Sequence, residues 1–321
     1  MLKGRGLRAG ERVGPYWVLC QLGRGGMARV YLARSAARPE VALKVLEPEF
    51  TGQARSARFE REVDAASRLS HPGCARMLDH GSTADGHLYL AIERLRGPTL
   101  REALAARGRL SLREVIDIGR QLCDALDHAH AAGVMHRDIK PENVMYRGPG
   151  GTGDVVLIDF GLSRLRDDAP LTVAGTCLGS PSYVAPERLL ERPADGRADL
   201  YAVGVVLYEL AAGRAPFVGD GPLAIARHHI TTRPPPLGEL RPGVPPALAA
   251  IVHRALEKQP DERFPRAAIM ARALEAVPLA EGEAEVEGDG EGKLEKADSE
   301  AERDGEKGSA WVDTGPSDSI H

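Results

Sequence analysis

The string HRDIKPEN, at residues 136–143 of this 321-residue chain, decides the fold class. It places a carboxylate, a cation and a side-chain amide within eight residues, after a helical pattern and before a short apolar run. Asp138 can accept the proton of an incoming hydroxyl, Lys140 can neutralise charge on a transferring phosphoryl group, and Asn143 can offer an oxygen to a magnesium ion. The string therefore indicates phosphoryl transfer.

A second string, VVLIDFG at 155–161, lies downstream. Its hydrophobic run predicts a strand that delivers a carboxylate at its end, and Gly161 allows the chain to turn sharply. Mg²⁺ prefers one or two carboxylates together with phosphate oxygens and water. We therefore expect Asp159 and Asn143 to hold Mg²⁺, with Mn²⁺ as an alternative ion.

Glycines are concentrated upstream, in LGRGGMARV at residues 22–30. They let backbone N–H groups approach phosphate oxygens without Cβ clashes. Strand-like residues follow the cluster, so it lacks the strand–turn–helix context of a dinucleotide site. Taken alone, the cluster fits a structural turn between two strands as well as it fits a phosphate cradle.

Lys44 ends the apolar run VALK at 41–44. A lysine is costly to bury without a partner, so this side chain either faces solvent from an edge strand or binds the α and β phosphates beside a carboxylate. Glu62, on a helix predicted over residues 54–70, is the candidate partner. Glu60 is the competitor, two residues away and therefore on another face of that helix.

Short apolar runs separated by glycine predict a β-rich region before residue 95, and helical periodicity predicts a mostly helical region after residue 98. Residues 198–212 are apolar on nearly every face, which predicts a helix buried inside the domain that stops at Gly213. The clearest strands are Tyr16–Leu19, Ala28–Ala33, Val41–Leu46 and Leu88–Ile92.

Helix boundaries are marked by local signals. Two capping boxes, TLRE at 99–102 and SLRE at 111–114, predict helix starts. The remaining signals are a buried stripe of Val115, Gly119, Leu122, Leu126 and Ala129, a C′ glycine at Gly133, and first-turn prolines at Pro245 and Pro265 of two later helices.

In this order, the four strings resemble the signature set of protein kinases. The closest likeness is to bacterial eukaryotic-like (Hanks-type) serine/threonine protein kinases, over residues 16–276. The resemblance implies an α+β, two-lobed protein-kinase fold. A small β-rich N-lobe with one main helix would span residues 16–95, and a larger, mostly helical C-lobe would span residues 96–276.

Further motifs extend the resemblance. APE at 185–187 is similar to the end of an activation segment, and DLYAVG at 199–204 is similar to the buried central helix of the large lobe. Arg263 resembles the arginine that, in this family, pairs with the glutamate of the APE motif, which is Glu187 in this chain. The alternative for Arg263 is an ordinary surface arginine.

The resemblance also implies an ATP site between the lobes. The adenine would bind the hinge backbone beside the gatekeeper Ile92. Ala28 stands where the third glycine of the family pattern belongs, a departure that would alter ATP affinity modestly. The implied ATP-binding residues are Leu22, Gly23, Arg24, Gly25, Gly26, Met27, Ala28, Val30, Ala42, Lys44, Glu62, Glu93, Leu95 and Met145.

The implied activity is transfer of the ATP γ-phosphoryl group to serine or threonine hydroxyls of proteins, with Asp138 and Lys140 as catalytic residues. The position of Lys140, two residues after Asp138, is typical of the serine/threonine class. The string GSPSY at 179–183 resembles the substrate-docking loop of that class, with Ser180 at the docking position.

Regulation is implied by Arg137, which precedes the catalytic aspartate. In the family, such an arginine often makes activity depend on a phosphorylated activation segment, because phosphate pairs with arginine and orders the loop. Thr172 and Thr176 are the candidate phosphorylation sites, modified in trans by a second kinase molecule. The alternative is that both are ordinary loop threonines.

Charge is distributed unevenly along the chain. The net charge is −4, but residues 281–321 alone contain 14 acidic and 4 basic residues. We therefore predict a disordered acidic tail over residues 277–321 and a flexible basic arm over residues 1–15. In residues 1–280, basic residues outnumber acidic residues only modestly, and no strip of alternating aromatic and basic residues is present. Nucleic acid is therefore not an expected partner.

The four cysteines form no CxxC pair, which favours free thiols in a reducing compartment. No secretory segment follows the start, and the longest apolar run, Val203–Ala212, is too short to span a bilayer. We therefore expect a cytoplasmic protein that acts on protein substrates and makes no membrane contact.

Other functions remain as alternatives. A catalytically silent pseudokinase scaffold would share the fold, and a small-molecule phosphotransferase would share the base and the acidic metal ligand. The second class lacks the docking and anchoring segment from Ser180 to Glu187. Four histidines could suggest a metal site, but solvated or capping histidines fit their surroundings better; they are His128, His130, His228 and His229.

Overall fold

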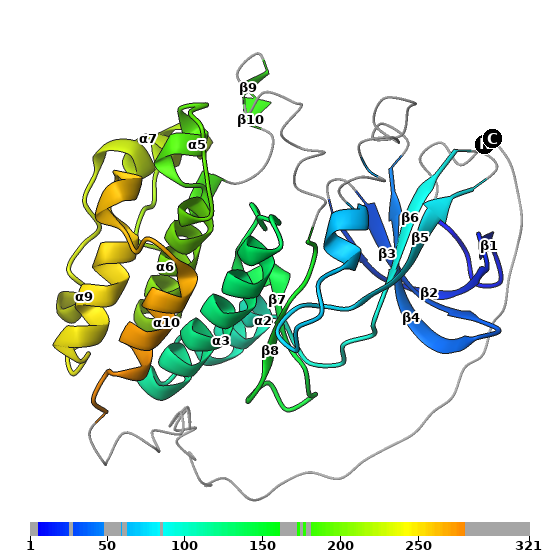
Figure 1. Cartoon of the computed structure of the whole chain (residues 1–321), viewed down its shortest axis with the longest axis horizontal. Coiled ribbons are helices and arrows are strands. Elements are labelled where there is room, and N and C mark those ends of the chain that lie inside the picture. Colours follow the sequence, from blue (N-terminus) through cyan, green and yellow to red (C-terminus); the bar gives the residue numbers. More distant parts are fainter. Residues whose placement is uncertain are drawn as a thin grey trace, which may run out of the picture. The chain divides into compact units, whose positions relative to one another are not determined.

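The structure is a computed structural model that describes residues 6–25, 28–47, 59, 63–83, 86–160, 172–173, 176–177 and 181–279 (Figure 1). For residues 172–173 and 176–177 it describes the backbone alone. Among the described residues, no helix is both long enough and apolar enough to cross a membrane.

The N-lobe is a six-stranded antiparallel sheet in the order β1-β2-β3-β4-β6-β5 (Figure 1). Side chains of a strand alternate between the two faces of a sheet. In β4, Val41 and Leu43 belong to a hydrophobic core on one face, while Ala42 and Lys44 line a cleft on the other. The strands are β1 Arg12–Val13, β2 Tyr16–Arg24, β3 Ala28–Ser35, β4 Arg38–Leu46, β5 Met77–Ser82 and β6 Leu88–Ile92.

The C-lobe is mostly helical and contains the largest hydrophobic core cluster. Its helices are α2 Leu100–Arg107, α3 Leu112–Ala131, α5 Pro186–Leu189, α6 Arg197–Ala212, α7 Pro222–Thr231, α8 Leu237–Leu240, α9 Pro246–Ala255 and α10 Ala267–Glu275. Short 3-10 turns are η2 Pro141–Asn143, η3 Pro181–Tyr183 and η4 Pro260–Glu262. Two hairpins complete it, β7 Val144–Tyr146 with β8 Val155–Leu157, and β9 Thr172–Val173 with β10 Thr176–Cys177.

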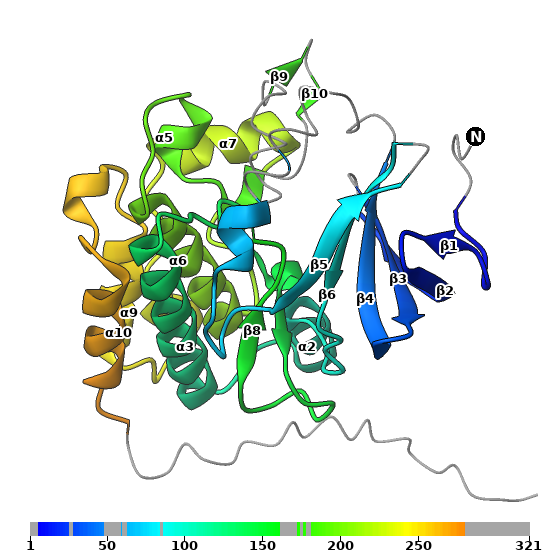
Figure 2. The same ribbon diagram turned by 45° about the vertical axis from the view of Figure 1, so that its right-hand side comes forward.

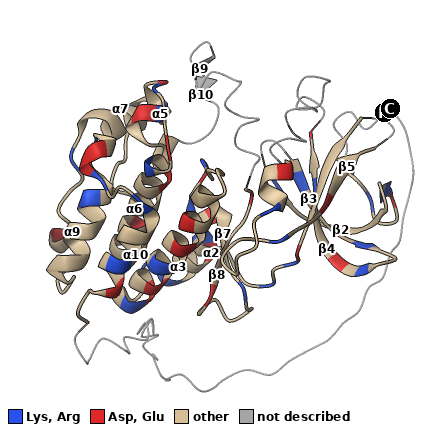
Figure 3. Ribbon diagram, viewed as in Figure 1, with Lys and Arg blue, Asp and Glu red and all other residues tan. Residues whose placement is uncertain are grey.

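Helix α6 lies at the centre of the C-lobe, packed against α3 and α9 (Figure 2). Every residue from Ala198 to Ala211 is buried, which confirms the buried helix expected from its apolar composition. Gly213 is its C-cap with φ of 77°, a left-handed conformation that glycine adopts without a Cβ penalty. Around it, α3 buries one stripe and carries charges of both signs elsewhere (Figure 3).

The helix-start signals are largely confirmed. Thr99 and Ser111 each accept a hydrogen bond from the backbone N–H of the glutamate three residues later, and that glutamate accepts one in return. Two proline assignments are wrong. Pro245 is the N-cap of α9, with Pro246 in the first turn, and Pro265 lies before the N-cap of α10.

The predicted limits of the disordered ends are also corrected. Arg12 and Val13 pair with β2, Val13 is buried, and the backbone N–H of Leu7 donates to the Tyr31 hydroxyl at 3.0 Å. The flexible arm predicted up to residue 15 is therefore wrong for this stretch, because an apolar side chain and backbone pairing tie it to the sheet. At the other end, Val277 is buried in the core, so the predicted tail begins too early.

Candidate active site

The β7–β8 hairpin brings the two polar strings of the C-lobe together. Val144 pairs with Leu157, so the residues before β7 and after β8 lie at the same end of the ribbon. The backbone N–H of Ile158 donates to the carbonyl of Asn143 at 3.0 Å. Asn143 and the residue after Ile158, Asp159, are thereby placed next to each other.

Asp138 is held by its own string. Its carboxylate accepts hydrogen bonds from Lys140 Nζ at 2.8 and 3.0 Å. The Nδ2 of Asn143 donates to the backbone carbonyl of Asp138 at 2.7 Å and to its carboxylate at 3.0 Å. Because the amide nitrogen of Asn143 is used in this way, its Oδ1 is the atom that can ligate a cation.

Asp199, at the start of α6, anchors the backbone of this string. Asp199 is only 1% exposed. Its carboxylate accepts the N–H of His136 at 2.9 Å and the N–H of Arg137 at 2.8 Å, and contacts His130 Nε2 at 2.8 Å. Burial opposes ionisation of Asp199, but the hydrogen bond and charge of His130, the charge of His136 and the backbone N–H of Arg137 together lower its pKa. Arg137 keeps a positive φ of 66° within this arrangement.

His136 links the two strings directly. Its Nε2 lies 2.8 Å from the carbonyl of Ile158, and its ring contacts the ring of Phe160 edge-on with centroids 4.6 Å apart. Asp159, between these two neighbours, has a positive φ of 72°. The carboxylate of Asp159 is therefore presented from a turn that is fixed on both sides.

The opposite wall of the site comes from the N-lobe. Gly23 pairs with Val30 across the β2–β3 hairpin, and the Gly25 N–H donates to the carbonyl of Ala28 at 2.8 Å. A Cβ on Gly23 would meet no atom within 4 Å, and neither glycine has a left-handed φ. The packing of the described residues therefore does not demand glycine at Gly23.

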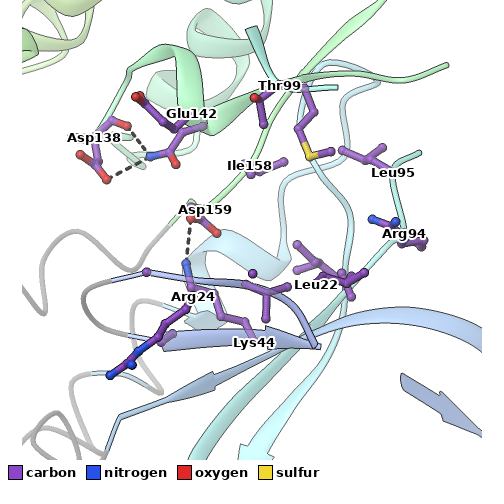
Figure 4. Close-up of a pocket in the computed structure, with 18 of the residues that line it drawn as sticks. Leu22, Arg24, Lys44, Arg94, Leu95, Thr99, Asp138, Glu142, Ile158 and Asp159 are labelled. Carbon is purple, nitrogen blue, oxygen red and sulfur yellow. Dashed lines mark hydrogen bonds and ion pairs between the residues drawn. The ribbon is translucent and has the colours of Figure 1, made fainter. Parts of the chain in front are cut away.

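Lys44 joins the two walls. Its Nζ lies 2.7 Å from Asp159 Oδ2 (Figure 4). Burial opposes ionisation of Asp159, but the charge and hydrogen bond of Lys44 lower the pKa of this carboxyl below its ordinary value. Lys44 lies on β4, which is flanked by β3 and β6, so the alternative of an edge lysine facing solvent is wrong.

Between the walls lies a cleft of about 620 Å³ (Figure 4). Every predicted nucleotide, catalytic or metal residue whose side chain is described lines it. These are Leu22, Gly23, Arg24, Gly25, Ala28, Val30, Ala42, Lys44, Glu93, Leu95, Asp138, Lys140, Asn143, Met145 and Asp159, together with the gatekeeper Ile92.

A family model described as protein kinase domain matches residues 16–274. The chain belongs to the protein kinase family. It is 41% identical over 271 residues to the serine/threonine-protein kinase pkn3 of Myxococcus xanthus, which covers 82% of this chain and 50% of that protein. The serine/threonine-protein kinases PknA and PknD of Mycobacterium tuberculosis are each 38% identical, over 82% and 83% of this chain and over 61% and 40% of their own lengths.

The predicted resemblance to bacterial serine/threonine kinases and the two-lobed kinase fold are therefore confirmed. The chain spans about half the length of the relatives it matches. Protein kinases as a family use ATP and a divalent metal ion.

The kinase cleft also contains residues that the sequence analysis did not assign to it. Leu46 lies two residues beyond Lys44 on the same face of β4, so strand alternation could have found it. For Thr99 and Glu102, the sequence predicts only a role in capping a helix. The full set of additional lining residues is Leu46, Arg94, Gly97, Thr99, Glu102, Glu142 and Ile158.

At the kinase hinge, the carboxylate of Glu93 is already engaged. It accepts the backbone N–H of Arg76 at 2.9 Å and pairs with Arg147 at 3.2 Å. The backbone N–H of Glu93 donates to the carbonyl of Arg76 at 3.0 Å. The backbone carbonyl is therefore the group that Glu93 can offer to the cleft.

The pair predicted to anchor the activation segment is present in the kinase domain. Arg263 donates two parallel hydrogen bonds to the Glu187 carboxylate, at 2.8 and 2.7 Å, and both residues are buried. The alternative of a surface arginine is wrong.

Some predicted kinase residues lie outside the described part of the chain. Gly26, Met27, Glu62 and Ser180 are among them, and so is Glu60, the competing partner for Lys44. The backbones of two other predicted residues, Thr172 and Thr176, lie in the β9–β10 hairpin, where they pair with Cys177 and Val173.

The four histidines have protein partners rather than solvent alone. His130 contacts the buried Asp199, and His228 contacts the Thr232 hydroxyl at 2.9 Å. His128 accepts the backbone N–H of Ser70 at 3.3 Å. His229 is fully buried, with its Nδ1 2.8 Å from the Tyr201 hydroxyl, so its assignment as a solvated or capping residue is wrong.

Proposed function

We propose that this chain is an active serine/threonine protein kinase that transfers the γ-phosphoryl group of Mg-ATP to protein hydroxyls. The observation that carries the proposal is the cleft in which Lys44, Asp159 and Asp138 meet, with Lys140 and Asn143 bonded to Asp138. The named serine/threonine kinases among the relatives support the same conclusion.

The oxygen donors of the cleft fit a magnesium ion. Asn143 can supply its Oδ1, because its Nδ2 donates to Asp138, and Asp159 can supply its carboxylate. Amide and carboxylate oxygens suit Mg²⁺, with Mn²⁺ as an alternative. When bound, the ion would neutralise charge on the phosphates. Lys44 would bind the α and β phosphates from the other side of Asp159.

The transfer step would be an in-line displacement at the γ-phosphorus. The substrate hydroxyl oxygen bonds to phosphorus, the bond to the bridging oxygen of ADP breaks, and the hydroxyl proton passes to Asp138. Lys140, 2.8 Å from Asp138, is placed to neutralise charge on the moving phosphoryl group. Catalysis then consists mainly of positioning and charge stabilisation.

The rest of the cleft would hold the nucleoside. Val30, Ala42 and Met145 would enclose the adenine, and the backbones of Glu93 and Leu95 would hydrogen-bond its edge. The open space around Gly23 supports close approach of the triphosphate to the glycine hairpin. Leu22, Arg24, Gly25, Gly26, Met27 and Ala28 would complete that contact, and Glu62 would pair with Lys44.

We further propose that phosphorylation of Thr172 or Thr176 by a second kinase molecule raises activity. The backbones of the two residues lie on the two paired strands of one short hairpin. Arg188 donates to the carbonyl of Arg137, which brings a second guanidinium to the arginine before Asp138. Ser180 would contact the protein substrate nearby.

Incorporation of labelled phosphate into a generic protein substrate tests the proposed activity. We expect the wild type to be active and Asp138→Asn to be slower by about 10²–10⁴-fold, the usual contribution of a positioned base. Equal incorporation by both proteins would refute the assignment of Asp138. A wild type that binds ATP without any transfer would point to a pseudokinase, and transfer to small molecules alone would point to that class of phosphotransferase.

A further inference from the structure

A short turn at residues 70–73 precedes β5 and is bonded to α3 through a pair of histidines. The backbone N–H of Ser70 donates to His128 Nε2 at 3.3 Å, and the backbone N–H of Gly73 donates to His71 Nδ1 at 3.0 Å. The two imidazole rings stack with an interplanar angle of 30° and centroids 5.4 Å apart. One ring belongs to the turn and the other to α3, so the stack joins the two.

Both imidazoles act as hydrogen-bond acceptors in this arrangement. Because a backbone N–H can only donate, Nδ1 of His71 and Nε2 of His128 carry no proton, and both rings are neutral. A protonated imidazole has an N–H at each nitrogen, so protonation would set one donor against another. It would also place a positive charge against the neighbouring ring. A proton on either ring is therefore incompatible with the hydrogen bond that the ring accepts.

The surroundings of the pair compensate such a proton only weakly. Within the described ranges, the titratable groups that act on His71 are His128 and Asp124, both on α3, and Asp124 is shared with Arg120 at 3.6 Å. From the other side, Arg147 donates to the backbone of the turn at 2.7 Å, and β8 contributes only apolar side chains. Burial and the charge of His128 lower the pKa of His71 below its ordinary value of 6.5, although Asp124 opposes the shift.

The opposite edge of the turn is held without any titratable acceptor. The backbone N–H of Leu157 donates to the carbonyl of Gly73 at 2.9 Å, and the N–H of Ala75 donates to the carbonyl of Leu157 at 2.8 Å. A Cβ on Gly73 would lie 3.0 Å from that of Ala125, so the turn packs closely on α3. Acid would therefore loosen the turn at its α3 edge while its β8 edge stays bonded.

The helical stretch at residues 63–67, just before the turn, contributes to the cores of both lobes. Val63 belongs to a small N-lobe core cluster that includes Leu46 of β4, whereas Ala66 belongs to the core cluster of the C-lobe. Lys44 lies two residues before Leu46 on the same strand. A change in how the turn lies on α3 would therefore reach the strand that carries Lys44.

We propose that His71 and His128 form a proton-sensitive joint between the lobes, which holds the turn on α3 while both rings are neutral and loosens it when either is protonated, so that kinase activity falls at acidic pH. The inference rests on the proposed kinase function. The closed joint binds a proton less readily than the open one. Closure is therefore complete above about pH 6.5 and is lost as the pH falls.

The test compares kcat and the KM for ATP between about pH 5.5 and about pH 8 for the wild type and the double variant His71→Asn with His128→Gln. Asparagine Oδ1 and glutamine Oε1 can accept the two backbone N–H groups and do not titrate. We expect equal kcat at the upper pH and, at the lower pH, a wild-type kcat about threefold to tenfold below that of the double variant, since one proton shifts an equilibrium by at most about tenfold per pH unit. Titration of Asp138 affects both proteins and cancels in the ratio.

Hydrogen exchange of peptides covering residues 63–76, compared between the two proteins at the same pH, measures the joint directly. We expect faster exchange in the wild type at about pH 5.5 and equal exchange at about pH 8. His128→Lys, with a fixed charge and no acceptor, should at about pH 8 resemble the wild type in acid. His228→Gln, on α7, is the matched control and should follow the wild-type profile. If the double variant does not fold, His128→Gln alone takes its place and should remove part of the pH response.

The two measurements distinguish failure of the joint from failure of the kinase activity. Faster exchange in the acidified wild type alone, without turnover at any pH, would support the joint and refute the kinase activity. Turnover with parallel pH profiles in the wild type and the folded double variant would overturn the joint and leave the kinase activity standing. Faster exchange in acid with an unchanged kcat ratio would also overturn the proposal, because it links the joint to turnover.

Discussion

The two walls of the cleft are built differently. On the C-lobe side, the backbone N–H groups of His136 and Arg137 are bonded to the carboxylate of Asp199, which lies in the lobe's core. On the N-lobe side, Gly23 and Lys44 are placed by strand register, and Lys44 forms an ion pair with Asp159 across the cleft. The difference indicates that buried hydrogen bonds fix the backbone around Asp138 in the C-lobe, whereas strand pairing positions the residues of the N-lobe wall.

From this difference we predict which lost charges lower the free energy of unfolding and which lower only the turnover rate. Buried polar groups contribute most when every donor has its acceptor, because an unpaired group inside a protein keeps its full desolvation penalty. Asp199 is such an acceptor for three donors. Lys44 belongs to an ion pair at the cleft, where the proposed nucleotide and metal would take the place of its partner.

The largest effect is expected for Asp199→Ala. The change leaves two backbone N–H groups and the His130 ring without their acceptor, so the free energy of unfolding should fall by about 3–5 kcal/mol. Urea denaturation followed by circular dichroism measures this loss. Turnover of the remaining folded protein should also fall at least about tenfold, since Asp138 loses the support of its backbone.

A surface carboxylate provides the control for this prediction. Asp124 pairs with Arg120 at 3.6 Å on the exposed face of α3, and Asp124→Ala should change stability by less than about 0.5 kcal/mol. A loss of less than about 1 kcal/mol for Asp199→Ala would show that the buried anchor does not set the stability of the C-lobe wall.

Lys44→Met should separate catalysis from stability. We expect turnover to fall by about 10²–10³-fold, because a cation aimed at the phosphates is lost. The free energy of unfolding should fall by less than it does for Asp199→Ala, because Asp159 lines the open cleft and water can reach its carboxylate there. Steady-state phosphorylation and urea denaturation of the same preparation test both parts. Arg96→Met, at an exposed pair with Glu40, is the matched control and should affect neither quantity. Loss of stability as large as that of Asp199→Ala would remove the distinction between the walls.

The polar residues of the site could be predicted because they come from short strings. Asp138, Lys140 and Asn143 lie within six positions of one another, and a single hairpin joins them to Asp159. A carboxylate, a cation and an amide this close together suit few reactions, so their positions along the chain were enough to predict the site. The partner of Lys44 could not be predicted in this way. Which of Glu60 and Glu62 faces Lys44 depends on how their helix is rotated about its axis, and sequence spacing alone does not determine that rotation.

Contacts between distant elements could not be predicted in the same way. Arg101 lies in a capped helix, and its side chain bonds to Glu142 and Glu209, which are 41 and 108 positions away. Strand β1 is two residues long and too short for a periodic pattern, so its register against Trp17 became visible only with the sheet. His229 was placed with solvated histidines because the residues that bury it, including Tyr201 and Phe217, come from other segments.

The smallest expected effect concerns His229. It tests whether the stability of the C-lobe core depends on pH. Its ring packs between Tyr201 of α6 and Phe217, while burial and the nearby charge of Lys258 lower its pKa from 6.5 to about 3. Between these two pH values the unfolded chain binds a proton that the folded chain does not, so stability from this residue is complete above about pH 6.5 and is lost as the pH falls.

One proton of this kind corresponds to about 1.4 kcal/mol per pH unit, so the wild type should lose about 2 kcal/mol more than His229→Gln between pH 7 and pH 5. Urea denaturation at the two pH values measures the difference, and comparing slopes cancels the packing cost of the substitution itself. His228→Gln is the control for a substitution on the same helix, because the His228 ring contacts the Thr232 hydroxyl at 2.9 Å and is not among the fully buried residues. If the free energy of unfolding falls equally with pH in the wild type and in His229→Gln, water must reach the ring in the folded protein. The core around α6 would then open locally more often than the burial of this helix implies.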